Sequence, residues 1–322
     1  MQDGGIFYLT NASGSWTHER LTTPPTDGAE PGRDADPAIA IDVDGSLWIA
    51  FTRYPADPIA CCPVDYAGPP PAGISYVHNP GSGWSEPAEI AGAGSNGPAL
   101  VVRDGAIHLA YRIGGTGFAE EEDDNPIRYA TDAGGSLTDV LVAERGSLPS
   151  LALAAEGAAH VAFDELRGDQ SRLWYAVGSA TAAFAVDLIP GSGDLNVGPL
   201  LAIGGDGGRH VYWSDWDGQA ARYSQYAGST WSAPIGAPSS ASASALALDD
   251  SGRVHLLAVN SALLYGSDAT GSFAFEPVAE ATICASDMGV DGSGRAHLLF
   301  IACDFDVEPT LYELWYAVSP PP

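Results

Sequence analysis

Lysine is absent from this sequence of 322 residues: all 13 cationic side chains are arginine, against 41 aspartates and glutamates, for a formal net charge of −28. Nucleic acids and anionic membrane surfaces both require clustered cations, so this balance excludes both as ordinary partners. No run approaches the roughly 18 consecutive apolar residues of a membrane-spanning helix, which excludes membrane insertion through such a helix.

Two further features are scarce. The first residues show no charged leader and no apolar segment, as expected of a cytosolic protein or of a secreted one whose leader is not part of this chain. Helix-favouring stretches are also few, because 39 glycines and 24 prolines interrupt the sequence. Hydrophobic residues, in contrast, make up 45% of the chain and suffice for a core. The composition therefore favours a folded protein that is not a helical bundle.

A repeat runs through the sequence. Gly-x-x-His followed by an apolar run occurs five times, and a sixth copy has Trp in the His position. An alternating strand precedes each copy, and acidic and glycine residues fill the turn between, which is the chemistry of a β-hairpin. The six copies are Gly45–Trp48, Gly105–His108, Gly157–His160, Gly207–His210, Gly252–His255 and Gly294–His297.

A strand ending in Tyr and then a Gly/Ser turn follow each hairpin, as in Gly73–Tyr76 and Gly83-Trp84. Four short antiparallel strands per unit, here named A to D in chain order, are typical of a propeller blade. We therefore predict an all-β, six-bladed β-propeller of one domain, 1–322, with four-stranded antiparallel blades. Residues 5–21 repeat the C–D pattern, and their D strand is expected to close the ring. Because seven C strands accompany six A–B hairpins, either the N-terminal or the C-terminal C strand is displaced, or the chain is cut from a longer one. The predicted blades are 37–91, 98–143, 149–189, 198–236, 244–279 and 284–319, with 5–21 added to the last.

The units resemble extracellular bacterial propellers of the sialidase-like, BNR-repeat type, whose A–B turn often reads Asp-x-x-Gly-x-x-His and whose C–D turn ends in Gly-Ser-Trp. The resemblance covers nearly the whole chain but rests on scaffold positions, so it implies a fold rather than an activity. Sialidase Asp boxes place Gly two residues after Asp, whereas Asp132…Gly135 and Asp268…Gly271 place it three after.

A sialidase-like site needs arginines that grip a carboxylate, a nucleophilic Tyr and an acid. Arg33, Arg53 and Arg112 lie on the face with the long B–C loops, with Tyr54 near them in sequence and Asp164 as a carboxylate. We interpret these residues as ligand-binding candidates. The Arg-Ile-Pro signature expected before the first A strand is absent here.

A second ligand-contact candidate on this face is Trp216 with Asp215 and Asp217. An exposed indole can stack on a saccharide while carboxylates accept hydrogen bonds from its hydroxyls. Irregular loops on a regular scaffold are where binding residues concentrate.

Oxygen-bearing side chains precede the A strands and would converge on the axis of a propeller. Asp36, Asn96, Asn196 and Asp287 are the metal candidates, because Ca²⁺ takes six to eight oxygen ligands. Six-bladed hydrolases of the phosphotriesterase and lactonase type hold a catalytic calcium in such a position. The alternative is that Asp and Asn simply favour the turn before a strand.

The repeated histidines are interpreted as scaffold. Equivalent positions on different blades cannot all approach one ion to about 2 Å. They are expected to bond their own A–B turn or to pack between blades.

The four cysteines bear on the compartment. Cys284 and Cys303 flank the last hairpin at similar heights, which favours a disulfide, while adjacent Cys61 and Cys62 form either a vicinal disulfide or a bond to a remote partner. Disulfides favour an oxidising compartment, so a secreted or periplasmic location is predicted.

The function that these features favour is a secreted module that recognises carbohydrate or an extracellular protein through its long B–C loops. The alternative is a Ca²⁺-dependent or sialidase-like hydrolase or lyase with an active site at the mouth of the axial channel. The acidic surplus argues against an acidic sugar such as sialic acid on this face.

Overall fold

The computed structural model confirms the predicted fold class, a six-bladed β-propeller built from antiparallel sheets. It describes residues 4–10, 15, 17–24, 26, 32–56, 70–114, 125–167, 170–192, 196–215, 220–239, 241–268, 273–304 and 311–319. All regular elements among these residues are β-strands. In that same part of the chain, no helix has the length and hydrophobicity of a membrane span.

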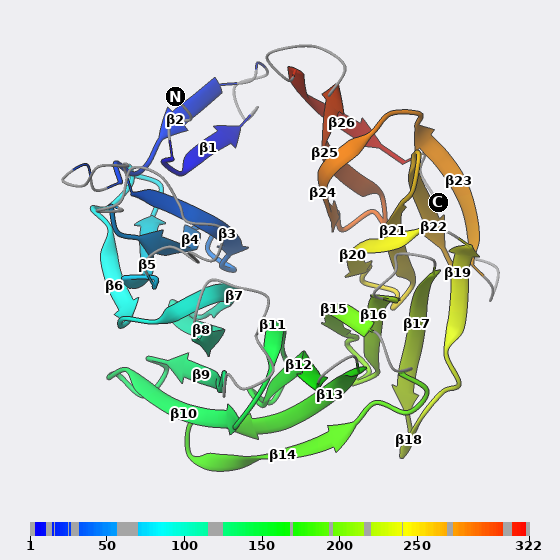
Figure 1. Ribbon diagram of the computed structural model, residues 1–322, viewed down its shortest axis with the longest axis horizontal. Coiled ribbons are helices and arrows are strands. Elements are labelled where there is room, and N and C mark those ends of the chain that lie inside the picture. The colour runs from blue at the N-terminus through cyan, green and yellow to red at the C-terminus, as the bar shows by residue number, and fades with distance from the viewer. Residues whose placement is uncertain are drawn as a thin grey trace. The chain divides into compact units, whose positions relative to one another are not determined.

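Each blade is a meander in which consecutive strands pair, as Figure 1 shows for β3 to β6. Blades 1 to 3 have four strands each. Blade 1 comprises β3 (Arg33–Ile41), β4 (Leu47–Tyr54), β5 (Gly73–Asn79) and β6 (Ala88–Ala91). Blade 2 comprises β7 (Ser95–Arg103), β8 (Ala106–Ile113), β9 (Ile127–Thr131) and β10 (Thr138–Ala143). Blade 3 comprises β11 (Ser147–Leu153), β12 (Ala159–Arg167), β13 (Gln170–Ser179) and β14 (Ala182–Leu188).

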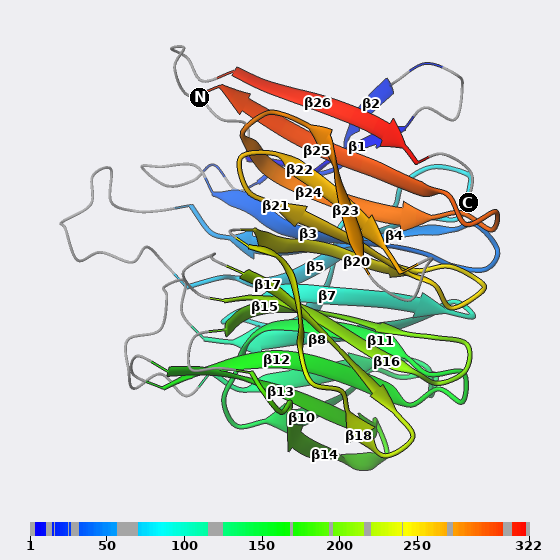
Figure 2. The same ribbon diagram turned by 90° about the vertical axis from the view of Figure 1, so that its right-hand side faces the viewer.

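In blade 4 the D strand is split into two pieces, both paired with the C strand, and blade 6 has three strands among the described residues. Figure 2 shows the long strands of blade 6 running side by side. Blade 4 comprises β15 (Asn196–Ile203), β16 (Arg209–Asp215), β17 (Ala220–Ala227), β18 (Thr230–Trp231) and β19 (Ile235–Ser239). Blade 5 comprises β20 (Ser242–Leu248), β21 (Val254–Val259), β22 (Leu263–Ser267) and β23 (Ala274–Ala279). Blade 6 comprises β24 (Ile283–Val290), β25 (Ala296–Asp304) and β26 (Leu311–Val318).

The N-terminal C–D segment forms its own hairpin, in which β1 (Phe7–Thr10) pairs with β2 (Thr17–Arg20). Closure of the ring by this segment stays a prediction. Within the chain two compact units are distinguished: Met1–Leu151 with Gly178–Val186, and Ala152–Val177 with Asp187–Pro322.

The A strands begin before the predicted blade starts, and in blades 1 to 3 the Pro taken as the first residue (Pro37, Pro98 and Pro149) lies inside the strand. In blades 1, 2 and 4 the register of strands A and B shifts at a β-bulge beside the Pro. In blade 1, Asp36 and Pro37 lie opposite Phe51 alone, so the register shifts between Ala35 and Ala38. The residue before Pro adopts positive φ in blades 1 to 4, at Asp36 (51°), Gly97 (61°), Leu148 (45°) and Gly198 (62°). A bulge tolerates Pro, which has no N–H to donate to the ladder. This repeated bulge re-aims the first residues of each A strand.

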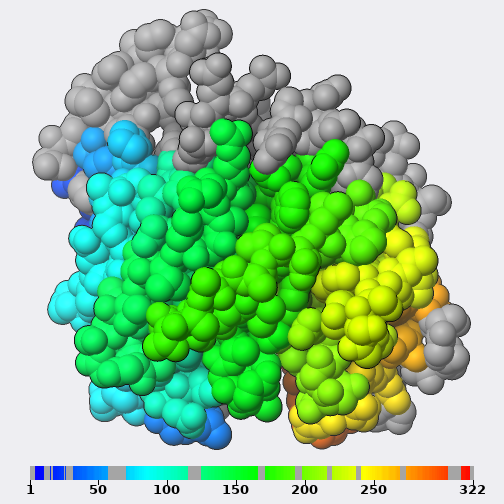
Figure 3. All heavy atoms as spheres, turned by 90° about the horizontal axis from the view of Figure 1, so that it is seen from below, coloured from blue at the N-terminus to red at the C-terminus, as the bar shows by residue number. Residues whose placement is uncertain are grey.

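The B strands carry the core. In β16, five consecutive residues are buried, from His210 to Ser214, because side chains on both faces are covered. Trp213 and Val211 pack with Leu173 and Tyr175 of β13 in one cluster. Figure 3 shows outer atoms of blades 4 and 5, in yellow-green and yellow, lying side by side.

The repeated histidines have a common partner that the sequence did not suggest. Each lies diagonal to the repeated Tyr of strand C and is bonded to its hydroxyl through Nδ1, as in His108–Tyr129 at 2.6 Å and His255–Tyr265 at 2.7 Å. The predicted bond to the A–B turn is also present in blade 6, where His297 Nε2 lies 2.9 Å from Asp291 Oδ2. The histidines therefore join strands B and C. The other pairs are His160–Tyr175, His210–Tyr223 and His297–Tyr316.

The C–D turn is locked to strand B by a second repeated contact. Asp132 Oδ1 accepts a hydrogen bond from Ile107 N at 2.8 Å, and Asp268 Oδ1 accepts one from Val254 N at 2.9 Å. In blade 6, the hydroxyl of Ser319 does the same for the residue at the start of β25. The aspartates of the sialidase-like motif thus have a structural role here, which we call the turn lock.

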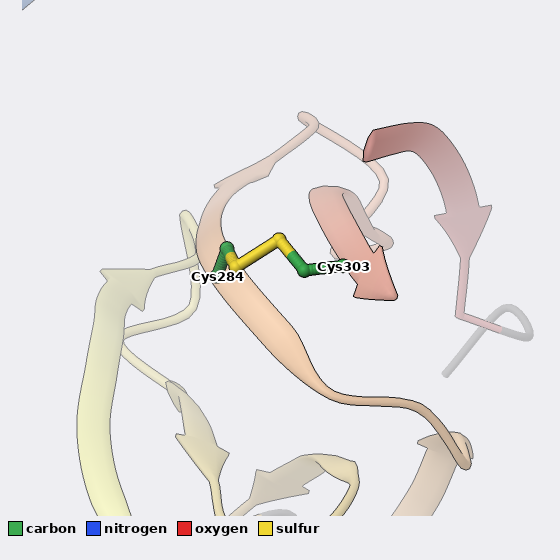
Figure 4. Close-up of a disulfide and its surroundings, with 2 residues drawn as sticks. All are labelled: Cys284 and Cys303. Atoms are coloured by element: carbon green, nitrogen blue, oxygen red, sulfur yellow. A yellow bond between two sulfur atoms is a disulfide. The ribbon is translucent and has the colours of Figure 1, made fainter. Parts of the chain in front are cut away.

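The predicted disulfide is present: Cys284 of β24 and Cys303 of β25 are bonded, with their Cα atoms 6.0 Å apart (Figure 4). Cys61 and Cys62 lie outside the described residues.

Candidate functional site

The candidate site is built at the loop-facing ends of β3 and β4 in blade 1. Here Arg33, Asp34 and Asp36 of the A strand meet Arg53 and Tyr54 of the B strand, which we call the blade 1 polar cluster. The ladder places Arg33 opposite Tyr54 and Asp34 opposite Arg53, and the bulge that follows turns Asp36 outward. The cluster thus contains three of the predicted ligand-binding residues and one metal candidate.

Arg53 is committed to an internal ion pair. Its Nε lies 2.8 Å from Asp34 Oδ1 and its Nη2 lies 3.0 Å from Oδ2. The Asp34 side chain is fully buried, whereas that of Arg53 is 25% exposed. Breaking such a pair would leave a buried carboxylate without its counter-charge, so Arg53 holds the framework of the cluster rather than a ligand.

Arg33, Tyr54 and Asp36 form the outward part of the cluster. The Arg33 guanidinium lies over the Tyr54 ring, 4.3 Å from its centroid, and Tyr54 Oη donates to Asp36 Oδ2 at 3.4 Å. Burial, followed by the charge of Asp36, raises the pKa of Tyr54, and Arg33 opposes this shift. The phenol therefore stays protonated near neutral pH. Arg33 and Asp36 are exposed and Tyr54 is half-buried.

Arg112, a predicted ligand-binding residue, and Asn96, a predicted metal ligand, lie opposite each other in blade 2. Arg112 Nε donates to Asn96 Oδ1 at 3.0 Å, and its Nη1 lies 3.3 Å from Ser147 Oγ at the start of blade 3. Asn96 Nδ2 donates to the carbonyl of Gly114 at 2.9 Å. With a guanidinium on its only side-chain oxygen, Asn96 does not fit a calcium site.

The position of Arg112 has a repeated role in joining blades. Its equivalent in blade 1, Thr52, accepts a hydrogen bond from Gly97 N of blade 2 at 3.1 Å. In blade 4 the equivalent Ser214 accepts one from Ala243 N of blade 5 at 2.8 Å. Asp164 occupies this same position in blade 3 and is buried. In blades 1, 2 and 4 the residue at this position therefore forms a hydrogen bond to the A strand of the next blade.

Asp215 is also engaged within the protein. Arg222 of the neighbouring β17 donates to it from Nε to both oxygens at 3.1 Å and from Nη2 to Oδ2 at 3.0 Å. Sequence reasoning missed Arg222, although its spacing from Asp215 across one B–C loop carries the signal. The other members of this candidate group, Trp216 and Asp217, lie outside the described residues.

The remaining metal candidates are spread over blades 4 and 6. Asp287 lies in β24, where its Oδ1 accepts a hydrogen bond from Met288 N at 2.8 Å. Asp287 is exposed, and partial desolvation raises its pKa while the hydrogen bond from Met288 N opposes this shift. Asn196 lies opposite Asp215 in the ladder, but its side chain is outside the described part. In that described part, no group of three or more His, Cys, Asp or Glu side chains is arranged to hold a metal ion.

Comparisons with known proteins give the fold and no family. No family model matches the chain, and no curated protein matches it. A Dyadobacter fermentans protein described as of unknown function superposes with a TM-score of 0.62 at 12% identity, covering 92% of this chain and 96% of that one.

Two enzymes are also among the similar structures. The NanB sialidase of Streptococcus pneumoniae gives a TM-score of 0.57 at 11% identity, over 89% of this chain and 67% of that one. An ulvan lyase described as a polysaccharide lyase gives 0.57 at 12% identity, over 91% and 83%. The predicted sialidase-like resemblance is thus confirmed for the scaffold.

Proposed function

We propose that this protein is a secreted, non-catalytic β-propeller that binds a neutral carbohydrate at the outward part of the blade 1 polar cluster. The observation that carries the proposal is the exposed group of Arg33, Tyr54 and Asp36 around one half-buried aromatic ring. A carboxylate accepts and a guanidinium donates, and together they match the paired hydroxyls of a sugar.

The backbone at Asp36 supports a binding role. Asp36 has a φ of 51° at a bulge position where blades 2 and 4 have glycine. A residue with a Cβ costs roughly 1–2 kcal/mol in this conformation, less for Asp than for most. Asp36 is exposed at this position, so its carboxylate is available to a ligand.

Binding is favoured over catalysis by the state of the other groups. Arg53 is neutralised by buried Asp34, and Arg112 bonds to Asn96 and Ser147, so neither arginine is held ready for a substrate carboxylate. A nucleophilic Tyr needs a base or a lowered pKa, whereas the pKa of Tyr54 is raised. Asp36 beside it suits neutral hydroxyls better than an acidic sugar.

The proposed location rests on the disulfide. A bonded Cys284–Cys303 pair is typical of secreted and periplasmic proteins, where thiols are oxidised. The net charge of −28 is compatible with this location and with a soluble ligand.

The test is a screen of neutral cello-, xylo-, manno- and galacto-oligosaccharides on an array, followed by calorimetry on any hit. Asp36→Gly removes the carboxylate and leaves the backbone in a conformation that glycine favours. Leu148→Gly makes the same backbone change at the equivalent position in blade 3 and is the matched control.

We expect Asp36→Gly to weaken binding at least tenfold, because hydrogen bonds to a charged group contribute about 1.5–3 kcal/mol. Leu148→Gly should bind like the wild type. Equal affinity of the two variants, or a blank array, would overturn the proposal. Release of reducing ends from any of these saccharides would overturn its non-catalytic part.

A further inference from the structure

Blade 4 departs from the repeat at two positions that face each other. The residue before the repeated His is Leu47, Ile107, Ala159, Val254 or Ala296 in the other blades, but Arg209 in blade 4. Directly opposite Arg209 in the ladder is Tyr226, at the position that Asp132 and Asp268 hold in blades 2 and 5. An apolar residue and an acceptor have thus both been replaced, one by a cation and the other by an aromatic ring.

The exchange removes the turn lock from this blade. In blade 5, Val254 N donates to Asp268 Oδ1 at 2.9 Å, and a phenol ring at the position of Tyr226 offers no carboxylate for this bond. The sequence here therefore gives up a contact that stabilises other blades. Positions that depart from a local rule of the repeat are candidates for a functional role.

Arg209 is held between two aromatic rings. Its guanidinium carbon lies 4.5 Å from the Tyr226 centroid and 5.3 Å from that of Tyr175 in β13. The Trp231 ring of β18 meets both tyrosines edge-on, at 5.4 Å and 5.3 Å. Tyr175 is buried and forms the floor, whereas Arg209, Tyr226 and Trp231 are partly exposed. These four residues are the blade 4 arginine site.

Among the described residues, Arg209 has no ion-pair partner. Its Nε is buried without a hydrogen-bond partner, and no carboxylate among the described residues lies within ion-pairing distance of it. The nearby Asp206 turns toward its own hairpin, where its Oδ1 accepts from Gly208 N at 2.9 Å. Arg53, Arg128 and Arg222, in contrast, each form an ion pair with an aspartate.

We propose that the blade 4 arginine site binds an oxyanion on a sugar, a carboxylate of a uronic acid or a sulfate ester. The two stacked rings fix the guanidinium plane, so its outer N–H groups can donate to two oxygens at once. Tyr226 and Trp231 supply aromatic surface for the sugar ring beside it. Arg209 directly follows the A–B turn of blade 4. The blade 4 arginine site would therefore bind an anionic sugar separately from the blade 1 polar cluster, which is proposed to bind neutral hydroxyls.

The test measures binding of a galacturonate hexamer by calorimetry, at low and at physiological salt. Its fully methyl-esterified form is the matched neutral ligand, and a sulfated galactan oligomer separates the two sources of oxyanion. The double variant R209V/Y226D copies the pair that forms the turn lock in blade 5. The single variant Arg209→Leu keeps apolar packing between the rings and removes only the charge.

We expect the hexamer, the sulfated oligomer or both to bind at least tenfold more tightly than the methyl ester, and to weaken as salt rises. Both variants should lose at least tenfold in affinity, with the thermal midpoint of the double variant unchanged or raised by the restored lock. Equal binding of esterified and free hexamer without binding of the sulfated oligomer, or full binding by the variants, would overturn the proposal. Because neutral saccharides test the blade 1 cluster, failure here leaves that proposal standing.

Discussion

Lowering the pH from 7.5 to 4 should destabilise the protein through its buried repeat histidines, and His160 shows how much. Its side chain is 3% exposed, Nδ1 is bonded to Tyr175 and Nε2 is buried without a partner. Burial, followed by the charge of Arg209, lowers the pKa of His160 from 6.5 to about 4, against a smaller opposing effect of Glu156. Protonation would place an N–H on both ring nitrogens, and the N–H of Nε2 would be buried without an acceptor.

Proton linkage determines how the free energy of unfolding changes with pH. Between pH 6.5 and about 4 the unfolded chain binds a proton at this position and the folded chain does not, so the free energy of unfolding falls as the pH falls. At roughly 1.4 kcal/mol per pKa unit, the lowered pKa of His160 corresponds to about 3 kcal/mol, fully present above pH 6.5 and lost near pH 4. His108, His210 and His255 have lowered pKa values from the same main cause, burial, and add to the loss.

The assay is urea unfolding followed by tryptophan fluorescence at pH 7.5, 6.5, 5.5 and 4.5. His160→Gln cannot titrate and should flatten the pH dependence by about 3 kcal/mol over this range, whatever its stability at pH 7.5. Tyr175→Phe is the matched control: it loses the hydrogen bond, at a cost of roughly 1 kcal/mol, and keeps the ionisable ring. If wild type and His160→Gln show the same slope, the linkage argument is refuted.

Four further perturbations test the scaffold and the metal hypothesis. Gly97→Ala should cost about 1 kcal/mol of unfolding free energy although its Cβ meets no atom within 4 Å, because φ is 61°; unchanged urea midpoints would contradict this. Asp132→Ala should cost about 1–2 kcal/mol by leaving Ile107 N without its acceptor, again measured by urea unfolding, with exposed Asp250→Ala as control. Replacing Cys284 and Cys303 together by Ser should cost about 3 kcal/mol for a loop of 19 residues, and a stability unaffected by reductant would speak against this. If Asp36 or Asp287 binds calcium, EDTA should lower the melting temperature by several degrees and added Ca²⁺ should restore it. An unchanged melting curve would contradict the calcium hypothesis.

The sequence predicted which residues form the candidate site better than it predicted what each residue does there. Arg33, Arg53 and Tyr54 were selected for their place on the long-loop face, and the structure does bring them together. Which arginine faces outward was not predictable, because it depends on the register of β3 against β4 and on the bulge at Asp36. The dipeptide signal for that bulge, a residue before Pro in each of four A strands, is present in the sequence but reads equally as a strand start.

By itself, the sequence determined the blades of this protein, because hairpin turns, alternating strands and the Gly-x-x-His repeat are local patterns whose period directly reflects four-stranded units. Only the tertiary structure decided the partners: His with a diagonal Tyr, Arg53 with Asp34, Asn96 with Arg112, and Arg209 between two rings. Such pairs join residues that are separated in the chain by turns and loops of variable length. Strand register and bulges, not composition, select which polar group meets which, and so whether a charged side chain holds the fold or faces a ligand.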